Sequence, residues 1–428
     1  MPRYLLLPKR KALRPVLIVI LSVGLLACML ATRALAQGTE KIVHVFGLSS
    51  NVGGVNPYGG VVLDSAGNLY GTTNYGGAKG FGMVFEMSRG DNGQWIEKGI
   101  DNFGEIGDDE AYGPIGGLVF DQVGNLYGTT IGGGTNGEGG TLFELSPAAN
   151  GKWISRTLYA FGNGMDGKDP RSTLIFDAAG NLYGTTVSGG TYGEGTVFRL
   201  SRVSGGDWQE SVLYSFGTTS ADAGQPNQPV AIDAFGNIWG TTEEMGAYGF
   251  GAIYELSPNS SGGGWTETII HSFAGGADGA YPQCGLIFDA SGNLYGTVGN
   301  GGANGNGYVF ELLPSEGGWT MTNLHNFDGV DGFGAIGNLV FGPSGILYGV
   351  TWQGGSFGDG NVYALRPTAD GTWREENLHS FHGGPQGCEP DAGVALDSAG
   401  NLYGTTLYCG SGQGVDGSGV VFEIVPPL

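Results

Sequence analysis

The sequence predicts a seven-bladed β-propeller, on the basis of an internal repeat, the strand pattern within it and the match between the two chain ends. The heptapeptide GNLYGTT and close variants such as GNIWGTT and GILYGVT occur seven times, at 67–73, 124–130, 180–186, 236–242, 292–298, 345–351 and 400–406. The copies lie 53 to 57 residues apart. A period of this size is typical of propellers and solenoids.

Each repeat contains four predicted strands, as the second repeat illustrates. GGLVFD at 116–121 alternates β-forming residues and NLYGTT resumes after a short turn, which indicates a hairpin. The recurring D-x-x-G-N puts Asp at the first position of a type I turn and Gly at the following site of positive φ. GTLFEL at 140–145 and WISRTLYAF at 153–161 supply the third and fourth strands. Four strands in seven repeats predict an all-β propeller.

The two ends of the chain complement each other. The seventh repeat has predicted strands at 393–397, 401–406 and 419–425 but no fourth strand. The missing strand is found near the N-terminus, where KIVHVF at 41–46 is similar to TIIHSF at 268–273. We therefore expect the N-terminal strand to complete the last blade, which closes a ring and leaves no sheet edge there.

Residues 1–36 are predicted to be a signal peptide and 37–428 a single propeller domain. Basic residues precede an apolar run, and Ala34-Leu35-Ala36 offers a cleavage site before Gln37. An alternative is a lipoprotein signal ending at Cys28. No other stretch approaches the roughly 18 apolar residues of a membrane span. The mature chain is expected to be a soluble monomer, secreted or in the periplasm or at the cell surface.

The charge of the mature chain excludes whole classes of partner. Residues 1–36 hold six of the 18 Lys+Arg and none of the 40 Asp+Glu, so 12 basic residues remain against 40 acidic ones, a net charge of about −28. Such a charge repels nucleic acid and anionic membranes. We therefore expect neither as a partner.

Three cysteines follow the predicted signal peptide. Cys388 precedes the first strand of the last blade and Cys409 follows its second strand, so both fall on one face of that blade. An exported protein favours disulfides. We predict a bridge between Cys388 and Cys409 and expect Cys284, two blades away, to be free.

Histidines and short motifs give no strong catalytic or metal signal. His44, His271, His325 and His379 share one repeat position in separate blades, where other repeats have Tyr, so they cannot converge on one ion. GGSFG at 354–358 lacks the strand-turn-helix setting of a nucleophile elbow. Asp-Gly pairs such as Asp166-Gly167 are first of all turn residues. No cofactor and no metal are predicted, although calcium at these pairs stays an open alternative.

Long loops gather on one face of the predicted ring and carry the candidate binding residues. In a four-stranded blade, the loop into the first strand and the loop between the second and third strands lie on the same face. These loops hold 18 Asp+Glu against three basic residues, together with many aromatic rings. Rings beside carboxylates stack on sugars or enclose cations, although rings can also simply anchor Gly-rich loops. The candidate ligand-binding residues are Tyr75, Tyr112, Tyr192, Tyr248, Tyr281, Trp352, Tyr408, Asp108, Asp109, Glu110, Glu243 and Glu244.

The repeat also resembles a known family. GLxFDxxGNLYGTT followed by a Gly-rich loop and GTVFEL is similar to the tandem repeat of the GloVer, choice-of-anchor family of exported bacterial proteins. The resemblance covers residues 41 to 425. It implies export and a propeller-like array, and it implies no established activity.

Three functions remain open on the sequence. The first is a non-catalytic exported binding or scaffold propeller that engages a neutral glycan, a peptide or an envelope protein. The second is a glycoside hydrolase or polysaccharide lyase, for which Asp108-Asp109-Glu110 and Glu243-Glu244 are the notable local carboxylate clusters. The third is a structural or adhesive surface module.

Overall fold

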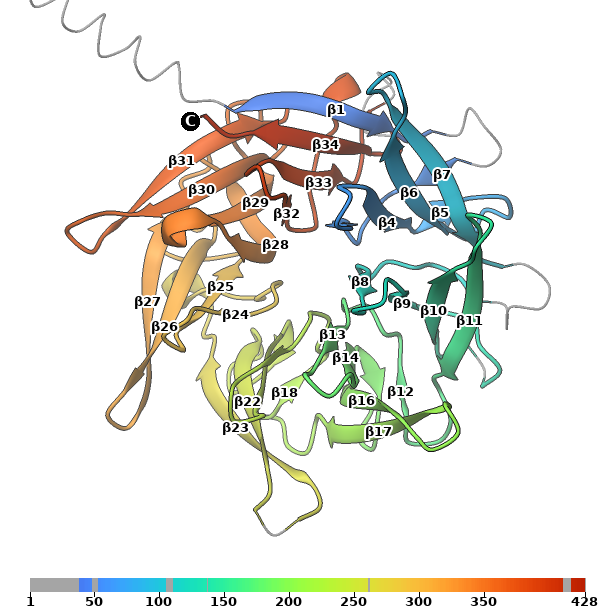
Figure 1. The fold of residues 1–428 in the computed structure, drawn as a ribbon. Coiled ribbons are helices and arrows are strands. Elements are labelled where there is room, and N and C mark those ends of the chain that lie inside the picture. The colour runs from blue at the N-terminus through green and yellow to red at the C-terminus, as the bar shows by residue number, and fades with distance from the viewer. Residues whose placement is uncertain are drawn as a thin grey trace, which may run out of the picture.

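The protein is a closed ring of seven four-stranded antiparallel sheets (Figure 1). This computed structural model describes residues 38–47, 53–104, 111–136, 138–260, 262–410 and 417–427. The predicted seven-bladed β-propeller is thereby confirmed. The predicted signal peptide and Cys28 lie outside the described residues. No helix in the described part of the chain has the length and apolar character needed to cross a membrane.

The blades are numbered in chain order, each from the inner to the outer strand. The first three are β3 (Val61–Leu63), β4 (Leu69–Thr73), β6 (Met83–Arg89) and β7 (Trp95–Asn102); β8 (Val119–Phe120), β9 (Leu126–Thr130), β10 (Thr141–Pro147) and β11 (Trp153–Ala160); and β13 (Ile175–Phe176), β14 (Leu182–Thr186), β16 (Thr196–Arg202) and β17 (Trp208–Ser215).

Blades 4 to 7 follow the same order, and the last takes its outer strand from the N-terminus. They are β19 (Ala231–Ile232), β20 (Ile238–Thr242), β22 (Ala252–Pro258) and β23 (Trp265–Ser272); β24 (Ile287–Phe288), β25 (Leu294–Val298), β26 (Tyr308–Ser315) and β27 (Gly318–Asn326); β28 (Phe333–Phe341), β29 (Leu347–Gln353), β30 (Asn361–Pro367) and β31 (Trp373–Ser380); and β32 (Ala395–Leu396), β33 (Leu402–Thr406), β34 (Val420–Val425) and β1 (Thr39–Val45).

Short elements occupy the loops. Three two-stranded ladders form where the sequence predicted only loops: β2 (Gly54–Val55) with β5 (Tyr75–Gly76), β12 (Gly167–Lys168) with β15 (Ser188–Gly189), and β18 (Ala223–Gly224) with β21 (Glu244–Met245). Two 3-10 turns also lie there, η1 (Gly276–Asp278) and η3 (Gly384–Gln386), whereas η2 (Pro343–Gly345) forms the hairpin turn between β28 and β29 on the other face of the ring.

Closure of the ring depends on the N-terminal strand. β1 pairs antiparallel with β34, from Thr39 opposite Val425 to Val45 opposite Val420. Figure 1 shows the two strands side by side although they come from opposite ends of the chain. The predicted closure is confirmed, and the strand begins two residues earlier than the predicted 41–46.

The heptapeptide first makes a turn. One Asp64 carboxylate oxygen, Oδ1, accepts the backbone N–H groups of Ala66 and Asn68, each at 2.9 Å, and the other oxygen accepts the Asn68 amide at 2.8 Å. Gly67 has a φ of 82°, where a residue with a side chain would be strained. The predicted hairpin turn is confirmed, with the Asn side chain as an additional bond.

The second glycine of the heptapeptide makes room for an aromatic ring. A Cβ on Gly71 would stand 2.5 Å from the Phe85 ring and 2.7 Å from the Gly60 carbonyl oxygen. The same ring position is filled by Phe143, Phe198, Tyr254, Phe310, Tyr363 and Phe422 in the other blades. Gly71 therefore allows the Phe85 ring, from the third strand of the same blade, to pack directly against the second strand.

The leucine and tyrosine of the heptapeptide face opposite neighbours. Leu69 packs in a cluster with Val421 and Tyr403 of blade 7, whereas Tyr70 packs in a cluster with Leu118 and Phe143 of blade 2. Seven such clusters fill the spaces between the blades. Burial of these apolar side chains, at about 25 cal/mol per Å², stabilises the ring.

The first threonine of the heptapeptide connects neighbouring blades. The hydroxyl groups of Thr72, Thr185 and Thr241 donate to backbone carbonyls of the next blade, at 3.1, 3.2 and 2.8 Å. The carbonyls belong to the segment just before the first strand of that blade. Most first strands are shorter than predicted, and β32 has two residues instead of five.

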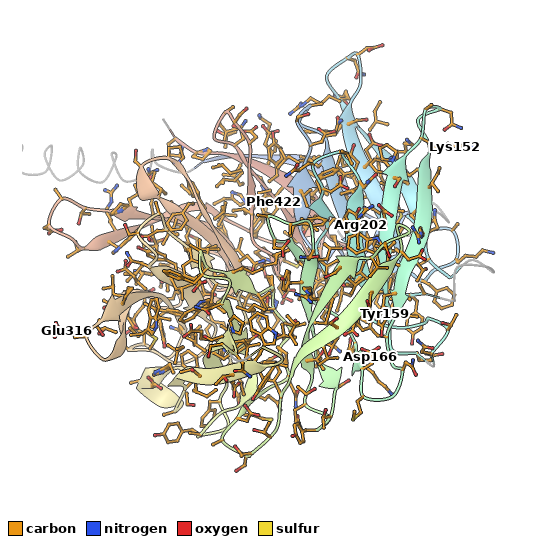
Figure 2. The ribbon with its side chains drawn as sticks, turned by 60° about the horizontal axis from the view of Figure 1, so that its bottom comes forward. Lys152, Tyr159, Asp166, Arg202, Glu316 and Phe422 are labelled. Atoms are coloured by element: carbon orange, nitrogen blue, oxygen red, sulfur yellow. A yellow bond between two sulfur atoms is a disulfide. The ribbon has the colours of Figure 1, made fainter. Side chains whose placement is uncertain are left out.

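The outer strands carry a second connection between blades. A His or Tyr near the end of one outer strand faces a Glu on the next, as in His44 with Glu97 at 3.3 Å and Tyr214 with Glu267 at 3.3 Å. A His or Tyr at this position can also face an Asp in the loop that follows its own strand. Figure 2 shows one such pair, Tyr159 and Asp166, in which the Tyr159 hydroxyl donates to the Asp166 carboxylate at 2.8 Å.

Burial shifts the pKa values of these outer-strand groups. It raises the pKa of Glu40, Glu210 and Glu375 to about 7, and burial beside Asp222 raises that of Glu267 to about 9. A raised carboxyl pKa stabilises the fold at low pH, and that contribution is lost as the pH rises through the folded value. The free energy of unfolding therefore falls as the pH rises from 6 to 9, because these carboxyls lose their protons over that range.

We predict that Glu267→Gln removes part of this pH dependence. The amide stays neutral and can still donate to Asp222, so the variant should melt about 2 °C above the wild type at pH 9, roughly what 1 kcal/mol gives in a large domain, and close to it at pH 5. Glu316→Gln, at an exposed hairpin tip (Figure 2), is the control. Thermal melts from pH 5 to 9 that run parallel for Glu267→Gln and the wild type would contradict the prediction.

Candidate functional site

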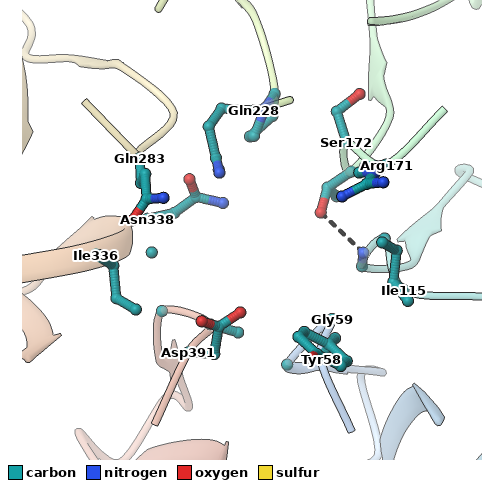
Figure 3. Close-up of a pocket in the computed structure, with 18 of the residues that line it drawn as sticks. Tyr58, Gly59, Ile115, Arg171, Ser172, Gln228, Gln283, Ile336, Asn338 and Asp391 are labelled. Carbon is teal, nitrogen blue, oxygen red and sulfur yellow. Dashed lines mark hydrogen bonds between the residues drawn. The ribbon is translucent and has the colours of Figure 1, made fainter. Parts of the chain in front are cut away.

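A cavity of about 420 Å³ lies on the axis of the ring and is lined by residues of all seven blades. One residue from each blade forms a ring around this cavity, which we call the axial ring. Each of these residues stands six positions before the Asp, or Gly342 in blade 6, that begins the hairpin turn leading into the heptapeptide. These residues are Tyr58, Ile115, Arg171, Asn227, Gln283, Ile336 and Asp391. Figure 3 shows such side chains around the opening, with Arg171 and Asp391 on opposite sides.

A left-handed backbone turn aims each ring residue at the axis. Two positions before the ring, φ is positive in every blade: 56° at Asn56, 66° at Gly113, 59° at Asp169, 57° at Gln225, 55° at Tyr281, 70° at Gly334 and 57° at Glu389. For the five residues other than Gly this conformation costs about 1–2 kcal/mol each. Such strain persists only where the surrounding structure fixes it.

The backbone N–H of each left-handed residue donates to a carbonyl of the preceding blade, and the carbonyls of Asn56, Gly113, Asp169 and Glu389 also accept an N–H from their own blade. The N–H of Glu389 donates to the Asp359 carbonyl of the preceding blade at 2.9 Å, and its own carbonyl accepts the N–H of Leu407 at 3.0 Å. Asn56 repeats the arrangement, with its N–H on the Ser418 carbonyl at 3.0 Å and its carbonyl on the Asn74 N–H at 3.0 Å. The ring around the cavity is thus bonded both to its own blade and to the previous one.

Two amide side chains of the ring, those of Asn227 and Gln283, bind the carboxylate of Glu243. Asn227 donates to Glu243 Oε2 at 2.7 Å, and Gln283 donates to Glu243 Oε1 at 2.5 Å. Glu243, one of the predicted acidic residues, is therefore fixed next to the cavity. Gln228 and Asn338 add two further amides to the lining on the same side (Figure 3).

Arg171 is the one basic side chain among the residues that line the cavity. Its guanidinium makes three hydrogen bonds to the Asp169 carboxylate, at 2.7 to 3.0 Å. The charge of Arg171 is therefore largely compensated by its neighbour two residues earlier.

Asp391 has no such partner. Among the described residues, no group donates a hydrogen bond to its carboxylate. Burial, with the nearby carboxylates of Glu389 and Glu243, raises the pKa of Asp391 to about 6. The charge of Asp391 also acts on Tyr58 of the next blade. Burial, together with Tyr408 and Asp391, raises the pKa of Tyr58 to about 12.

The predicted aromatic residues divide into a rim and a supporting set. Tyr75, Tyr192 and Tyr248 are 56%, 54% and 63% exposed, on three separate blades. They form an open rim rather than one pocket.

The supporting set makes contacts of its own. Tyr112 donates to Glu138 at 2.7 Å, Trp352 donates to Glu389 at 3.1 Å, and Tyr281 packs edge-on against Phe250. Tyr408 lies beside Tyr58. Glu389, held by Trp352, is thereby placed next to Asp391.

The other predicted residues are less central. Asp108, Asp109 and Glu110 lie outside the described residues. Glu244 is exposed and accepts a hydrogen bond from Gln225 at 3.2 Å. In the parts of the chain that the structure describes, no group of three His, Cys, Asp or Glu side chains could hold a metal ion.

The cysteines follow the expected arrangement. Cys388 and Cys409 form a disulfide with their Cα atoms 5.4 Å apart, and Cys284 is free and buried. The bridge lies beside the left-handed Glu389 and ties the two loops of blade 7 together. Cys284 exchanges hydrogen bonds with the Thr297 backbone.

Sequence reasoning missed most of the axial ring. It selected loop residues by charge and aromaticity, which favoured the rim, and so it passed over Asp391, Asn227, Gln228 and Gln283. A signal was present: in six repeats a Pro stands just before the ring position, and that position differs chemically from repeat to repeat. The axial residues can therefore be recognised in the sequence as a position whose residue type changes from repeat to repeat while the residues around it recur.

Fold and cavity together define a seven-bladed β-propeller with a polar axial site on its loop face. The chain belongs to the family of the Gloeobacter/Verrucomicrobia repeat, whose model matches residues 32–225, 99–288 and 289–427. The resemblance seen in the sequence is thereby confirmed.

Other comparisons are more distant. No curated protein sequence matches the chain. A luciferin-regenerating enzyme structure is 14% identical, covering 72% of this chain and 90% of its own, with a TM-score of 0.44. A Bacteroides fragilis structure named as a "putative 6-phosphogluconolactonase" is 14% identical, covering 86% and 87%, with a TM-score of 0.48. Likenesses at this level carry no inference about activity.

We predict that the Asp391 carboxyl titrates near pH 6 in the folded protein. The physical causes are its burial and the fields of Glu389 and Glu243, so Glu389→Gln should lower the midpoint. Carboxyl-detected NMR titration of the folded chain measures both values. A wild-type midpoint near 4, the ordinary value for Asp, would contradict this description of the site.

Proposed function

We propose that this protein is an exported binding propeller that takes a sugar unit of a glycan in its axial cavity. The observation that carries the proposal is the combination of amide side chains, a tyrosine ring and a free carboxylate around one cavity of about 420 Å³. Cavities of this order accept small polar ligands, and a few placed polar groups fix their orientation.

The chemistry of the lining suits hydroxyl-rich ligands. Amides both donate and accept hydrogen bonds, as sugar hydroxyls do, and Gln228 has a side-chain amide with no partner among the described residues. Tyr58 offers an aromatic ring on the opposite side of the cavity. The exposed rings of Tyr192 and Tyr248 on the rim can contact further sugar units of a longer chain.

Export rests on independent observations. The predicted signal peptide precedes the propeller, and the Cys388–Cys409 disulfide is compatible with an oxidising compartment. A location outside the cytoplasm would bring the loop face into contact with extracellular or envelope glycans. A peptide or an envelope protein bound at the rim is the alternative ligand.

A carbohydrate-active enzyme is the second candidate function. Asp391 is a carboxyl whose pKa is raised to about 6, so it takes up its proton just below neutral pH, and Glu243 is a second carboxylate close enough to contribute to that shift. General acid catalysis needs such a pair. Reducing-end assays on a polysaccharide panel test it, because activity that Asp391→Asn abolishes would establish catalysis.

We predict that the axial cavity, and not the turn face, carries glycan binding. Tyr58→Ala and Gln228→Ala should each weaken binding of the best ligand from a glycan array about tenfold or more. Phe235→Ala is the control, because Phe235 is 87% exposed at a turn on the other face. Isothermal titration calorimetry gives the affinities.

The same series separates the rim from the cavity. Binding that survives both cavity variants but is lost in Tyr192→Ala and Tyr248→Ala would move the site to the rim. If no glycan on the array binds, the proposal of a glycan ligand is wrong, and a pull-down from an envelope fraction then tests the peptide or protein alternative.

A further inference from the structure

We propose that the axial cavity recognises a primary ammonium group, such as that of a de-N-acetylated amino sugar, through Asp391 and Tyr58. The inference deepens the proposed glycan binding, on which it rests, by naming the substituent that the site selects. It follows from the one charged group of the ring that the protein leaves without a partner.

Asp391 is placed to receive a donor from the cavity. It belongs to the ring around the axis, and Figure 3 shows its carboxylate directed toward the opening. Within the described chain nothing donates a hydrogen bond to it. Asp391 is only partly buried, so its carboxylate remains accessible from the cavity that it lines. A ligand that supplies an N–H donor with a positive charge gives this carboxylate the partner that the described chain does not supply.

The other charges at the cavity also favour a cation. Four carboxylates, Asp169, Glu243, Glu389 and Asp391, stand around it, against the single guanidinium of Arg171. Arg171 is engaged with Asp169 in a bidentate pair, so it does not neutralise Asp391. An anionic ligand is repelled, and a neutral one leaves Asp391 uncompensated.

Tyr58 supplies the second contact. It occupies the ring position of blade 1, next to Asp391 of blade 7, and the two groups interact. A cation between a carboxylate and an aromatic ring gains both a charge-assisted hydrogen bond and cation–π attraction. An N-acetylated sugar has an amide at the same carbon, which can donate one N–H to Asp391 but brings no positive charge, so it gains neither the attraction between opposite charges nor the cation–π contact.

Protonation of Asp391 turns this recognition off. Glu389 on its own segment and Glu243 on blade 4 raise its pKa, with burial, to about 6, while Tyr58 and Arg171 are the other titratable groups lining the cavity. Binding of an alkylammonium group that stays protonated throughout, such as those of spermidine, is therefore strong at pH 7.5 and weakens as the pH falls through about 6, whereas a glucosamine amine needs a pH just below neutral to carry its charge while Asp391 is still ionised. Binding of a neutral sugar lacks this dependence.

The test compares two oligosaccharides that differ only at the nitrogen. The tetramer of glucosamine and the tetramer of N-acetylglucosamine are titrated by calorimetry at pH 6.5 and 5, and spermidine, an ammonium probe that carries no sugar, is titrated at pH 7.5 and 5. The variants are Asp391→Asn, which keeps the shape and removes the charge, and Asp370→Asn, an exposed control with the same change in net charge. Thermal melts confirm that both variants fold.

The inference expects the glucosamine tetramer to bind at least about tenfold tighter than the acetylated one at pH 6.5, where its amines are partly protonated and Asp391 is mostly ionised. Asp391→Asn and pH 5 should each erase that difference, whereas Asp370→Asn should not. Equal affinity of the two tetramers, or a preference that survives Asp391→Asn, overturns the ammonium inference and leaves glycan binding standing.

Two further outcomes separate the inference from the proposed function. Spermidine binding that needs Asp391, with no binding of either tetramer, supports the ammonium site and contradicts the glycan ligand. Failure of all three probes overturns the inference. Binding of the acetylated tetramer alone supports the glycan ligand and contradicts the ammonium site.

Discussion

Seven left-handed residues, one before each axial position, are the constraint on which the rest of the structure depends. Each one bends the chain from the outer strand of one blade into the axis, and its N–H donates to a carbonyl of the preceding blade. Five of the seven are not glycine, so the ring accepts about 1–2 kcal/mol of strain at each. In return the residues that line the cavity are fixed by backbone bonds rather than by their own side chains, which leaves those side chains free to differ.

The heptapeptide and the axial ring are two consequences of this arrangement. Gly71 lets Phe85 pack inside the blade, Leu69 and Tyr70 face the two neighbouring blades, and Thr72 reaches the segment before the next first strand. Architecture is thus concentrated in the residues that repeat. Asp391 and its counterparts around the axis, which vary from repeat to repeat, are the residues to which we assign the proposed ligand recognition.

The fold could be predicted almost fully from the sequence, because the hairpin turn at Asp64 and the closing strand at 41–46 each have a local or pairwise pattern. The site could be predicted only in part. Glu243 was found through its charge, but Asp391 has no motif, and the left-handed turns at Gln225 and Tyr281 carry no glycine to reveal them. Convergence of seven segments on one axis is a property of the closed ring, and it becomes visible only when the blades are placed.

Amide hydrogen exchange measured by mass spectrometry tests the central claim most directly, namely that the left-handed residues hold the axial ring rigid. Peptides that cover 222–228 and 387–393 should each retain an amide that exchanges as slowly as those of the central strand peptide 402–406, because the Gln225 and Glu389 N–H groups bond to the preceding blade and open only when the ring unfolds. Rapid exchange in the two axial peptides, while the strand remains protected, would show that the cavity is not preformed and would contradict this account.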